Sequence, residues 1–553
     1  MSFSLSSGGP ACRPQDLALR SRPRLSRGRT VPATGSEPAQ RTHYNAPPFL
    51  FIDMKYESII GLEIHVQLKT KSKLFCSCSN AGEYEPPNTT VCPVCLAHPG
   101  TLPVTNKEAL IFAIKASKAL GCIITSQSKF DRKHYFYPDL PKAYQISQYD
   151  RPVGTNGLVR IEIDNPEAVR KTADVRINRL HLEEDAAKNI HENGATLVDF
   201  NRCGTPLSEI VTEPDLRTPE EAKIFLQELR TLMRTIGVSE ADMEKGHMRC
   251  DANISIRPAG DNKLYPKTEV KNINSFRAVE RALKYEIDRQ TKLWEEGNPV
   301  NYLSTRGWDD DKQQTFEQRK KEEAHDYRYF PDPDLPPLNL AELERDVTLP
   351  ELPPAKRLRF AQEYCFAPDA AKLLADDPDW ADFAENVMSE TYAWLKATPG
   401  YTAAAEHKQR EECSTVGKLV SSWILNRLMR QMADAAIDIR ILKITPENFA
   451  EFITLIHTSQ INSSNAQKLL GFMLEAGEDP SHIMEEKGLG QVADAGFIEN
   501  AVMRVVENNP KQVEQYRAGK VEVIKFLIGM VMKETEGKVD PKLATEKLKE
   551  KLG

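Results

Sequence analysis

The sequence predicts an α+β protein in which a largely antiparallel sheet comes first and helices follow. Short β-like runs succeed one another in the N-terminal half without the strict strand–helix alternation of a parallel sheet. Helical periodicity dominates after residue 349. Neither G-x-G-x-x-G nor G-x4-G-K-[ST] occurs, so neither a Rossmann fold nor a P-loop is predicted.

The strands and helices of the first region are placed by periodicity and by end signals. β-branched or alternating runs predict strands over residues 58–66, 158–163, 175–182 and 253–257. Apolar spacing predicts helices over residues 107–120, 219–236 and 275–294. The second helix opens with Pro-Glu-Glu at Pro219 and ends before Gly237, as helices commonly begin and end.

Helices are predicted for the later region, which follows a proline-rich segment at residues 349–354. Ser464 caps an apolar face that contains Leu469 and Met473 and closes at Gly477. We expect a disordered extension over residues 1–53, a first domain over 54–345, a helical domain over 346–445 and a helical tail over 446–553.

Composition describes an ordinary water-soluble chain. Hydrophobic residues make up 40% of it, and no apolar run approaches the roughly 18 residues of a membrane span. The net charge of -7 argues against a generally basic surface, so any nucleic-acid contact should be local. Ten Lys and Arg against seven Asp and Glu occur between Lys511 and Lys551, which is either a solvated helix face or an RNA-backbone contact.

Residues 1–53 differ from the rest, with seven arginines and no lysine. Such Arg-rich and Ser-rich composition is compatible with a mitochondrial or plastid targeting segment. Interrupting acids, together with the clean opening of the folded part at Met54, favour an over-extended start and a cytoplasmic protein.

Four of the ten cysteines cluster as C-x-C-x13-C-x2-C, namely Cys76, Cys78, Cys92 and Cys95. Two short pairs that bracket a loop are what a tetrahedral structural zinc site needs. Buried free thiols are the alternative. The other six cysteines are assigned no role, and the absence of a secretory signal favours reduced thiols.

Acid-rich motifs hold the candidate chemistry. His65 shares a strand face with Glu63, the run HLEEDAAK offers Glu184 among other acids, and NRCGTPLSE offers Arg202 and Glu209. Carboxylates that converge with an imidazole suit Mg²⁺, which can bridge nucleotide phosphates. Taken singly, each motif could equally be surface charge.

The segment 131–148, DRKHYFYPDLPKAYQISQ, fits neither period 2 nor period 3.6. Its three consecutive aromatics, its X-Pro steps and its charges predict a structured loop that contacts a ligand. The candidates for that contact are Arg132, Lys133, Tyr135 and Tyr137. A proline-rich surface connection is the alternative.

Long motifs give the chain a specific resemblance. GLEIHVQLKTKSKLFC, NTTVCPVC, the 131–148 segment, RLHLEEDAAK, LVDFNRCGTPLSEIVTEPD, MRCDANIS, EVKNINSF and DYRYFPDPDLPPL resemble, in this order, the GatB family, which comprises the B subunits of the glutamine-dependent aspartyl/glutamyl-tRNA amidotransferases. The resemblance runs from Met54 to the C-terminus. One departure is Ser208, where the family usually has an aliphatic residue.

The resemblance implies a cradle-like catalytic domain, a helical domain and a tRNA-binding tail. It implies ATP- and Mg²⁺-dependent phosphorylation of the amino-acid carboxylate on Glu-tRNA(Gln) or Asp-tRNA(Asn), then amidation by ammonia from a glutaminase A subunit, with a C subunit completing a heterotrimer. It places the Mg²⁺ ligands on His65, Glu184 and Glu209 and the zinc ligands on the four clustered cysteines. Arg202, Arg249 and Lys271 lie in matching motifs as phosphate candidates.

The rival interpretation is a non-catalytic, zinc-containing tRNA-binding scaffold. The cysteine cluster and the basic tail support it. It leaves the conjunction of His65, Glu184 and Glu209 without a role.

Overall fold

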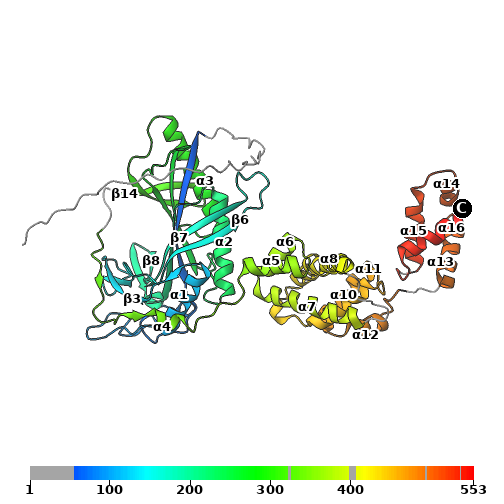
Figure 1. The fold of residues 1–553 in the computed structure, drawn as a ribbon, viewed down its shortest axis with the longest axis horizontal. Coiled ribbons are helices and arrows are strands. Elements are labelled where there is room, and N and C mark those ends of the chain that lie inside the picture. The colour runs from blue at the N-terminus through cyan, green and yellow to red at the C-terminus, as the bar shows by residue number, and fades with distance from the viewer. Residues whose placement is uncertain (1–54, 322–325, 398–405, 492–494, 536) are drawn as a thin grey trace, which may run out of the picture. The chain divides into compact units, whose positions relative to one another are not determined.

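The computed structural model describes residues 55–553 except 322–325, 398–405, 492–494 and 536. The expected extension over residues 1–53 therefore lies outside the described residues. Strands are confined to the first region and the later region is helical (Figure 1). The predicted α+β fold class is confirmed.

A nine-stranded sheet organises the first region. In the spatial order of the sheet, its strands are β14 (Gln314–Lys321), β13 (Leu303–Asp309), β12 (Thr268–Lys271), β11 (Met248–Pro258), β1 (Tyr56–Gln67), β10 (Pro206–Thr212), β7 (Thr172–Glu184), β6 (Gly154–Glu162) and β2 (Ile123–Ile124). Every neighbouring pair is antiparallel except β12 and β13. The chain between that parallel pair forms α3 (Phe276–Glu295), the helical crossover that parallel strands need.

Helices cover one face of this sheet. α1 (Lys107–Ala119) contacts β6 and β7, α2 (Pro219–Thr235) contacts β6, and α3 contacts β11. Local chemistry begins α2 where the sequence predicts, because the Thr218 hydroxyl accepts a hydrogen bond from the Glu221 N–H at 3.1 Å and Pro219 occupies the first turn.

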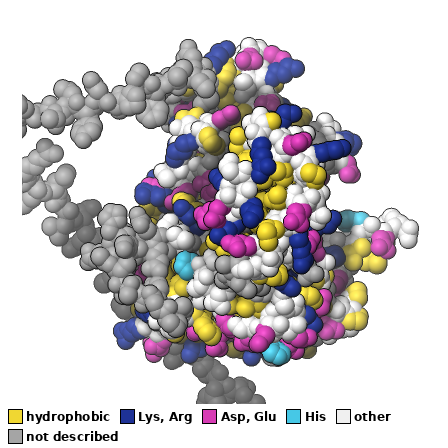
Figure 2. All heavy atoms as spheres, turned by 90° about the vertical axis from the view of Figure 1, so that its right-hand side faces the viewer, with side chains coloured by type: hydrophobic (Ala, Val, Ile, Leu, Met, Phe, Trp, Pro, Cys, Tyr) yellow, Lys and Arg dark blue, Asp and Glu magenta, His cyan; other side chains and the backbone are white. Residues whose placement is uncertain are grey.

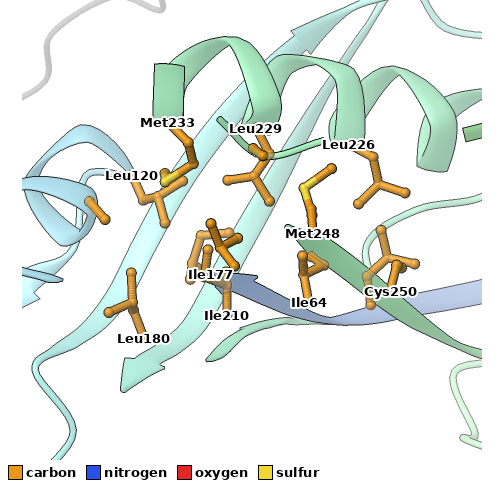
Figure 3. Close-up of a cluster of buried hydrophobic side chains, with 14 of the residues drawn as sticks. Ile64, Leu120, Ile177, Leu180, Ile210, Leu226, Leu229, Met233, Met248 and Cys250 are labelled. Carbon is orange, nitrogen blue, oxygen red and sulfur yellow. The ribbon is translucent and has the colours of Figure 1, made fainter. Parts of the chain in front are cut away.

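The covered face is a continuous apolar layer. Leu226, Leu229 and Met233 of α2 lie above strand residues such as Ile64 and Ile210 (Figure 3). These side chains are fully or almost fully buried. Since side chains alternate along a strand, the residues between them point to the opposite face of the sheet.

Smaller elements flank the sheet. They are β3 (Gln127–Ser128), β4 (Asp131–His134), β5 (Tyr144–Ser147), the hairpin β8 (Lys188–Glu192) and β9 (Ala195–Asp199), β15 (Phe330–Pro331), β16 (Leu338–Asn339) and α4 (Leu340–Glu344). The prediction of a loop over residues 131–148 is wrong at both ends, because β4 and β5 pair as antiparallel strands. Each is only four residues long, too short for its alternation to stand out beside the X-Pro steps between them.

The later region consists of helices. They are α5 (Pro353–Glu363), α6 (Pro368–Ala375), α7 (Pro378–Ala397), α8 (Glu406–Trp423), α9 (Met429–Asp434), α10 (Pro446–His457), α11 (Ser463–Ala476), α12 (Pro480–Glu486), α13 (Ala495–Asn508), α14 (Pro510–Arg517), α15 (Val523–Glu534) and α16 (Pro541–Leu552). One buried cluster spans residues 360–489 and another spans 498–552. Gly477 ends α11 at a φ of 72°, as its position in the sequence predicts.

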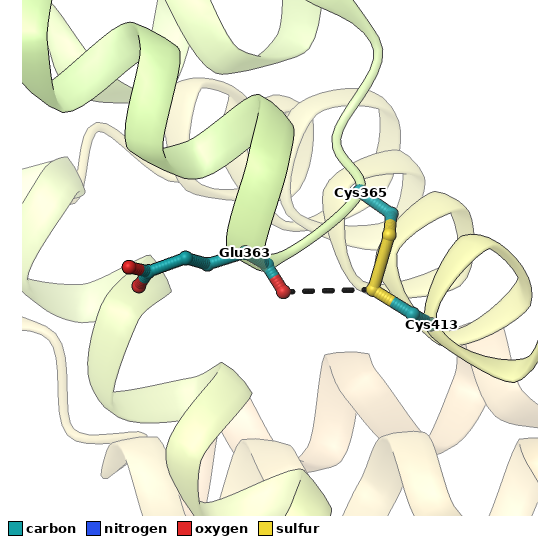
Figure 4. The surroundings of a disulfide bond; sticks show 3 residues. All are labelled: Glu363, Cys365 and Cys413. Carbon is teal, nitrogen blue, oxygen red and sulfur yellow. Dashed lines mark hydrogen bonds between the residues drawn. A yellow bond between two sulfur atoms is a disulfide. The ribbon is translucent and has the colours of Figure 1, made fainter. Parts of the chain in front are cut away.

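Cys365 and Cys413 form a disulfide with a Cα–Cα distance of 5.8 Å (Figure 4). The expectation of reduced thiols is wrong for this pair. The two cysteines are 48 residues apart, so no local spacing indicates the bond. The turn after α5 packs closely on α8, where a Cβ on Gly417 would collide with the Tyr364 carbonyl oxygen.

The surface carries both charges. Figure 2 shows Lys and Arg side chains interspersed with Asp and Glu on the face that it presents. This mixture agrees with the expectation that the chain is not generally basic. Among the described residues, no helix has the length and apolar character needed to cross a membrane.

Candidate active site

The face of the sheet opposite the helices borders a cavity of about 1010 Å³. Strands β1, β7, β10 and β11 contribute residues to its lining. So do residues 133–149, which lie between β2 and β6 in the chain, and residues 326–329, which follow β14. The cavity therefore lies where alternate residues of the central strands point away from the apolar layer.

Four residues form a row across the central strands. His181 on β7 is opposite Glu209 on β10, Glu209 is opposite His65 on β1, and His65 is opposite Arg249 on β11. Directly opposed residues on one sheet face have Cβ atoms about 4.5–5.5 Å apart. The antiparallel register thus brings together residues that are far apart in the sequence.

Glu183 joins this row and completes a cluster of two imidazoles and two carboxylates. His65 Nε2 lies 3.4 Å from Glu183 Oε1 and 3.5 Å from Glu209 Oε2. His181 Nε2 lies 3.3 Å from Glu209 Oε2. Glu209 is therefore shared by both imidazoles.

The charges of the cluster support one another. Burial alone lowers the pKa of His65, but hydrogen bonding to Glu183 and Glu209 outweighs it and raises this pKa well above its ordinary value. Burial raises the pKa of Glu209, yet His181 and His65 outweigh it, so this pKa lies well below the ordinary value. The imidazoles also outweigh burial at Glu183 and lower its pKa, so both carboxylates are ionised at neutral pH. A divalent cation that binds the carboxylates and an imidazole would displace the imidazole proton.

Two overlapping sets of side chains can hold a metal ion. Glu63, His65 and Glu209 form one set, and His181, Glu183 and Glu209 form the other. In each set the potential ligand atoms lie within 4.8 Å of one another. Carboxylate oxygens with an imidazole fit a hard divalent cation such as Mg²⁺ or Mn²⁺.

Glu184 does not join His65 and Glu209. Its side chain points to the other face, where Glu184 Oε2 accepts a hydrogen bond from Lys142 Nζ at 2.6 Å and Oε1 accepts one from the Ile146 N–H at 2.9 Å. It lines a second cavity, of about 310 Å³. Of the predicted ligand trio, the structure therefore brings His65 and Glu209 together and places Glu184 apart from them, because residues 181 and 183 share a strand face and residue 184 does not.

The predicted cations divide into those that line the large cavity and those that do not. Lys133, Arg249 and Lys271 line it. Asp185 binds Arg249 and raises the pKa of that guanidinium. Burial lowers the pKa of Lys271, but Asp251 and Glu269 outweigh it, so this side chain stays charged.

The other candidates, Arg132, Arg202 and Tyr137, do not line the large cavity. Arg132 Nε lies 2.8 Å from Asp332 Oδ2, and its Nη2 lies 2.9 Å from Asp334 Oδ2. Arg202 donates hydrogen bonds to the carbonyl oxygens of residues 186 and 187 at 3.0 and 2.9 Å. Tyr137 is 59% exposed and does not line the cavity.

Sequence reasoning found one member of an aromatic wall of this cavity and missed three. The wall consists of Tyr135, which is a predicted contact residue, and of Tyr149, Tyr327 and Tyr329. Two of them belong to DYRYF, a motif noted for the family resemblance but given no role. The signal that could have found them is the concentration of tyrosines in two segments otherwise rich in charge and proline.

The cysteine cluster is assembled as the spacing predicts. The Sγ atoms of Cys76, Cys78, Cys92 and Cys95 lie within 4.8 Å of one another. The N–H of Cys92 donates to Cys95 Sγ at 3.2 Å, the backbone-to-sulfur contact of a knuckle. A hydrogen bond from Cys76 lowers the pKa of Cys95 to about 4, and Lys73 contributes to this shift. This donor set fits a four-thiolate zinc site.

The fold and the cavity define a class: an α+β domain with a charged site on an open sheet face, followed by a helical region. The chain belongs to the GatB family. Residues 58–345 match the family model described as the GatB/GatE catalytic domain, and residues 407–552 match the one described as the GatB domain.

Curated relatives extend this similarity over the folded part of the chain. The B subunit of the aspartyl/glutamyl-tRNA(Asn/Gln) amidotransferase of Persephonella marina is 46% identical over 502 residues, which cover 90% of this chain and 100% of the relative. The protein of the same name from Carboxydothermus hydrogenoformans is 43% identical over 506 residues, covering 90% and 99%. That from Thermotoga maritima is 46% identical over 512 residues, covering 90% and 99%.

Proposed function

We propose that this chain is the component of a tRNA-dependent amidotransferase that activates and amidates the amino acid. The substrate is Glu-tRNA(Gln) or Asp-tRNA(Asn), and the product is Gln-tRNA(Gln) or Asn-tRNA(Asn). The observation that carries the proposal is the row of His181, Glu209 and His65 on the floor of a large cavity that cations also line. The names of the relatives support the same reaction.

The cavity suits phosphoryl transfer from ATP to a carboxylate. In such transfers, catalysis rests on positioning and on neutralising charge, so no protein nucleophile is required. Arg249 and Lys271 are held in place by Asp185 and Asp251, and both can face phosphate oxygens. When bound, Mg²⁺ neutralises the phosphate oxygens and aligns them for in-line transfer. Glu209 would hold it together with either Glu63 and His65 or His181 and Glu183, and the Glu184 expected from the sequence would not contribute.

Ammonia then displaces phosphate from the activated carboxylate. It has to arrive as NH₃, since NH₄⁺ has no lone pair for the attack. Burial lowers the pKa of Lys133, but Glu183 and Tyr329 outweigh it and raise this pKa above its ordinary value. The charged ammonium of Lys133 is therefore suited to binding anionic oxygens rather than to removing protons.

Partners and compartment belong to the same proposal. A glutaminase A subunit supplies ammonia, a C subunit completes the heterotrimer, and the tail over residues 446–553 binds tRNA. We place the protein in the cytoplasm. The four-cysteine cluster is assigned to structural Zn²⁺, because none of its cysteines lines the large cavity; Lys73 Nζ lies 3.8 Å from Cys95 Sγ.

The decisive experiment is amidation of Glu-tRNA(Gln) by the reconstituted complex with ATP, Mg²⁺ and ammonium salt, which removes the need for glutamine hydrolysis. Glu209→Gln should lower kcat by about 10²–10³-fold, because the shared carboxylate is lost. Glu192→Gln, at an exposed position of β8, is the matched control and should retain the wild-type rate.

Two results would contradict parts of the proposal. Wild-type rates from Glu209→Gln would remove the metal-site assignment. A wild-type complex that binds tRNA but forms no amide under any of these conditions would favour the rival scaffold function, for which the cysteine cluster is the supporting observation.

A further inference from the structure

The wall of the large cavity contains a stacked aromatic pair that the proposed chemistry does not use. The rings of Tyr149 and Tyr329 lie 4.4 Å apart between centroids and are inclined by only 13°. Both residues line the cavity. Tyr149 nevertheless remains 63% exposed, although Tyr329 covers one face of its ring.

The position of Tyr149 is fixed through its backbone. Its N–H donates a hydrogen bond to Asp131 Oδ2 at 3.0 Å, and Asp131 is only 1% exposed. Lys129 Nζ lies 2.5 Å from Asp131 Oδ1 and 2.7 Å from Asp150 Oδ1, so it ties the residue after Tyr149 to the same buried carboxylate. The exposed ring is thus mounted on a constrained turn.

Tyr329 is fixed from the opposite side. Its segment pairs with β4, where the His134 N–H donates to the Tyr327 carbonyl oxygen at 2.9 Å and Phe330 is opposite Arg132. The Tyr327 ring packs edge-on against Tyr329 at 6.3 Å. This packing prevents Tyr329 from swinging away from the stack.

A fixed aromatic face at the mouth of a charged cavity has a specific use. Aromatic rings stabilise a fold mainly through the area they bury, whereas this pair leaves the outer ring largely open. Planar bases stack on such faces with little dependence on their identity. The amino-acid carboxylate and the phosphates have cations to bind, so a base is the part of either substrate that an aromatic face fits.

We propose that Tyr149, backed by Tyr329, is the stacking platform for the adenine of a substrate. This inference rests on the proposed function, whose two adenine-bearing substrates are ATP and the 3′-terminal adenosine of the aminoacyl-tRNA. Tyr149 contacts the base, and Tyr329 is a positioning residue that holds the Tyr149 ring.

The kinetic test uses the reconstituted complex with ammonium salt as nitrogen donor and measures KM separately for ATP and for Glu-tRNA(Gln). Tyr149→Ala should raise one of these KM values by about 5- to 150-fold, the usual effect of losing one stacked base. Tyr149→Phe keeps the ring and should restore the wild-type KM. The substrate whose KM rises identifies the source of the adenine.

A matched control separates stacking from general disturbance of the loop. Phe136 is 82% exposed, lies on the same segment and does not line the cavity. Phe136→Ala should leave both KM values unchanged. Unchanged KM values in Tyr149→Ala, or equal rises in Tyr149→Ala and Phe136→Ala, would overturn the proposal.

A binding measurement keeps this inference distinct from the proposed reaction. Tyr149→Trp places a fluorophore at the platform, and a stacked base should quench its emission. The probes are ATP and an acceptor-stem RNA that ends in CCA, added separately without turnover. Quenching by one probe supports the platform even if the wild-type complex forms no amide, and quenching by neither refutes it.

Discussion

The two faces of the nine-stranded sheet are built from the same strands but have opposite chemistry. On β10, Ile210 is fully buried under the helices, while its neighbour Glu209 points into the large cavity. On β1, Ile64 likewise belongs to the buried apolar layer, while His65 lines the large cavity. Each strand thus contributes alternate residues to stability and to the site.

This difference implies that substitutions of neighbouring residues have different effects. A substitution on the covered face acts on the free energy of unfolding, because it leaves a void in a packed layer. On the proposed function, a substitution on the open face acts on turnover, because its side chain borders the cavity in which the reaction is placed. Unfolding and amidation measurements on adjacent residues therefore test the comparison directly.

The sharpest test is the pair Glu183 and Glu184. Glu183→Gln should lower kcat for amidation by about 10²–10³-fold and lower the melting temperature less than Glu184→Gln does, because His65 and His181 can give up their protons when this carboxylate is lost. Glu184→Gln should instead destabilise the fold by about 3 kcal/mol, because the partly buried Lys142 ammonium loses the buried carboxylate that pairs with it. Thermal unfolding and ammonia-dependent amidation, measured on both variants, distinguish the two effects.

A reversal of these two outcomes would break the comparison. If Glu184→Gln were as stable as the wild type but inactive, Glu184 would act in the reaction and the division by face would not hold. A double variant Lys142→Met/Glu184→Leu serves as control, since removing both charges should recover much of the lost stability.

Ile210→Ala tests the covered face beside Glu209. The truncation should cost about 2–5 kcal/mol in the free energy of unfolding, as buried Ile-to-Ala changes do. Chemical denaturation measures the loss, and kcat per folded molecule should remain at the wild-type value. A tenfold fall in kcat with normal stability would show that the faces are not independent.

Glu286→Gln tests a charge within the helix-covered layer. Glu286 is fully buried on α3, with Oε2 2.7 Å from Arg289 Nη2 and Oε1 3.2 Å from Arg306 Nε. Burial raises its pKa, but Arg289 outweighs this and lowers the pKa below its ordinary 4.5. Its stabilisation is therefore present above the unfolded-state pKa and is lost as pH falls through the lowered folded-state pKa.

The variant should be less stable than the wild type by about 2 kcal/mol at pH 7, the usual value of a charged hydrogen bond. The difference should shrink as the pH falls below about 4.5, where the unfolded carboxyl becomes protonated. Melting temperatures measured from pH 7 to pH 3 check this trend. A constant difference across that range would contradict the assigned pKa direction.

The smallest expected effect is at Ser208, next to Glu209 but on the covered face. Its hydroxyl is fully buried and has no hydrogen-bond partner among the described residues. Ser208→Ala should stabilise the protein by about 1 kcal/mol, because an unsatisfied buried hydroxyl is removed. Denaturant unfolding measures this gain, and a loss of stability would show that Ser208 has a partner after all.

Much of the fold follows from local patterns. The strand expected over residues 58–66 is part of Tyr56–Gln67, and the helix expected over 219–236 is Pro219–Thr235. Both carry long periodic patterns, and the helix has a capping residue and a helix-ending glycine. Short paired strands such as β4 and the disulfide at Cys365 depend on distant partners, so no local pattern reveals them.

The site was only partly predictable for a related reason. The rule that put Glu63 and His65 on one face also puts His181 and Glu183 on one face, and it would have selected Glu183 had it been applied there. Tyr149 could not be found in this way. Its place in the cavity depends on Tyr329, which is 180 positions later in the chain.

The row from His181 to Arg249 forms only when the central strands pair in the correct register. If β10 paired with β1 one residue out of step, Ser208 and Ile210 would enter the cavity and Glu209 would be pressed against α2. An almost correctly folded chain would then have no ligand set at all. A divalent cation held by the proposed ligand set would stabilise the correct pairing alone, by RT ln(1 + [ion]/Kd), and would do so before any substrate arrives.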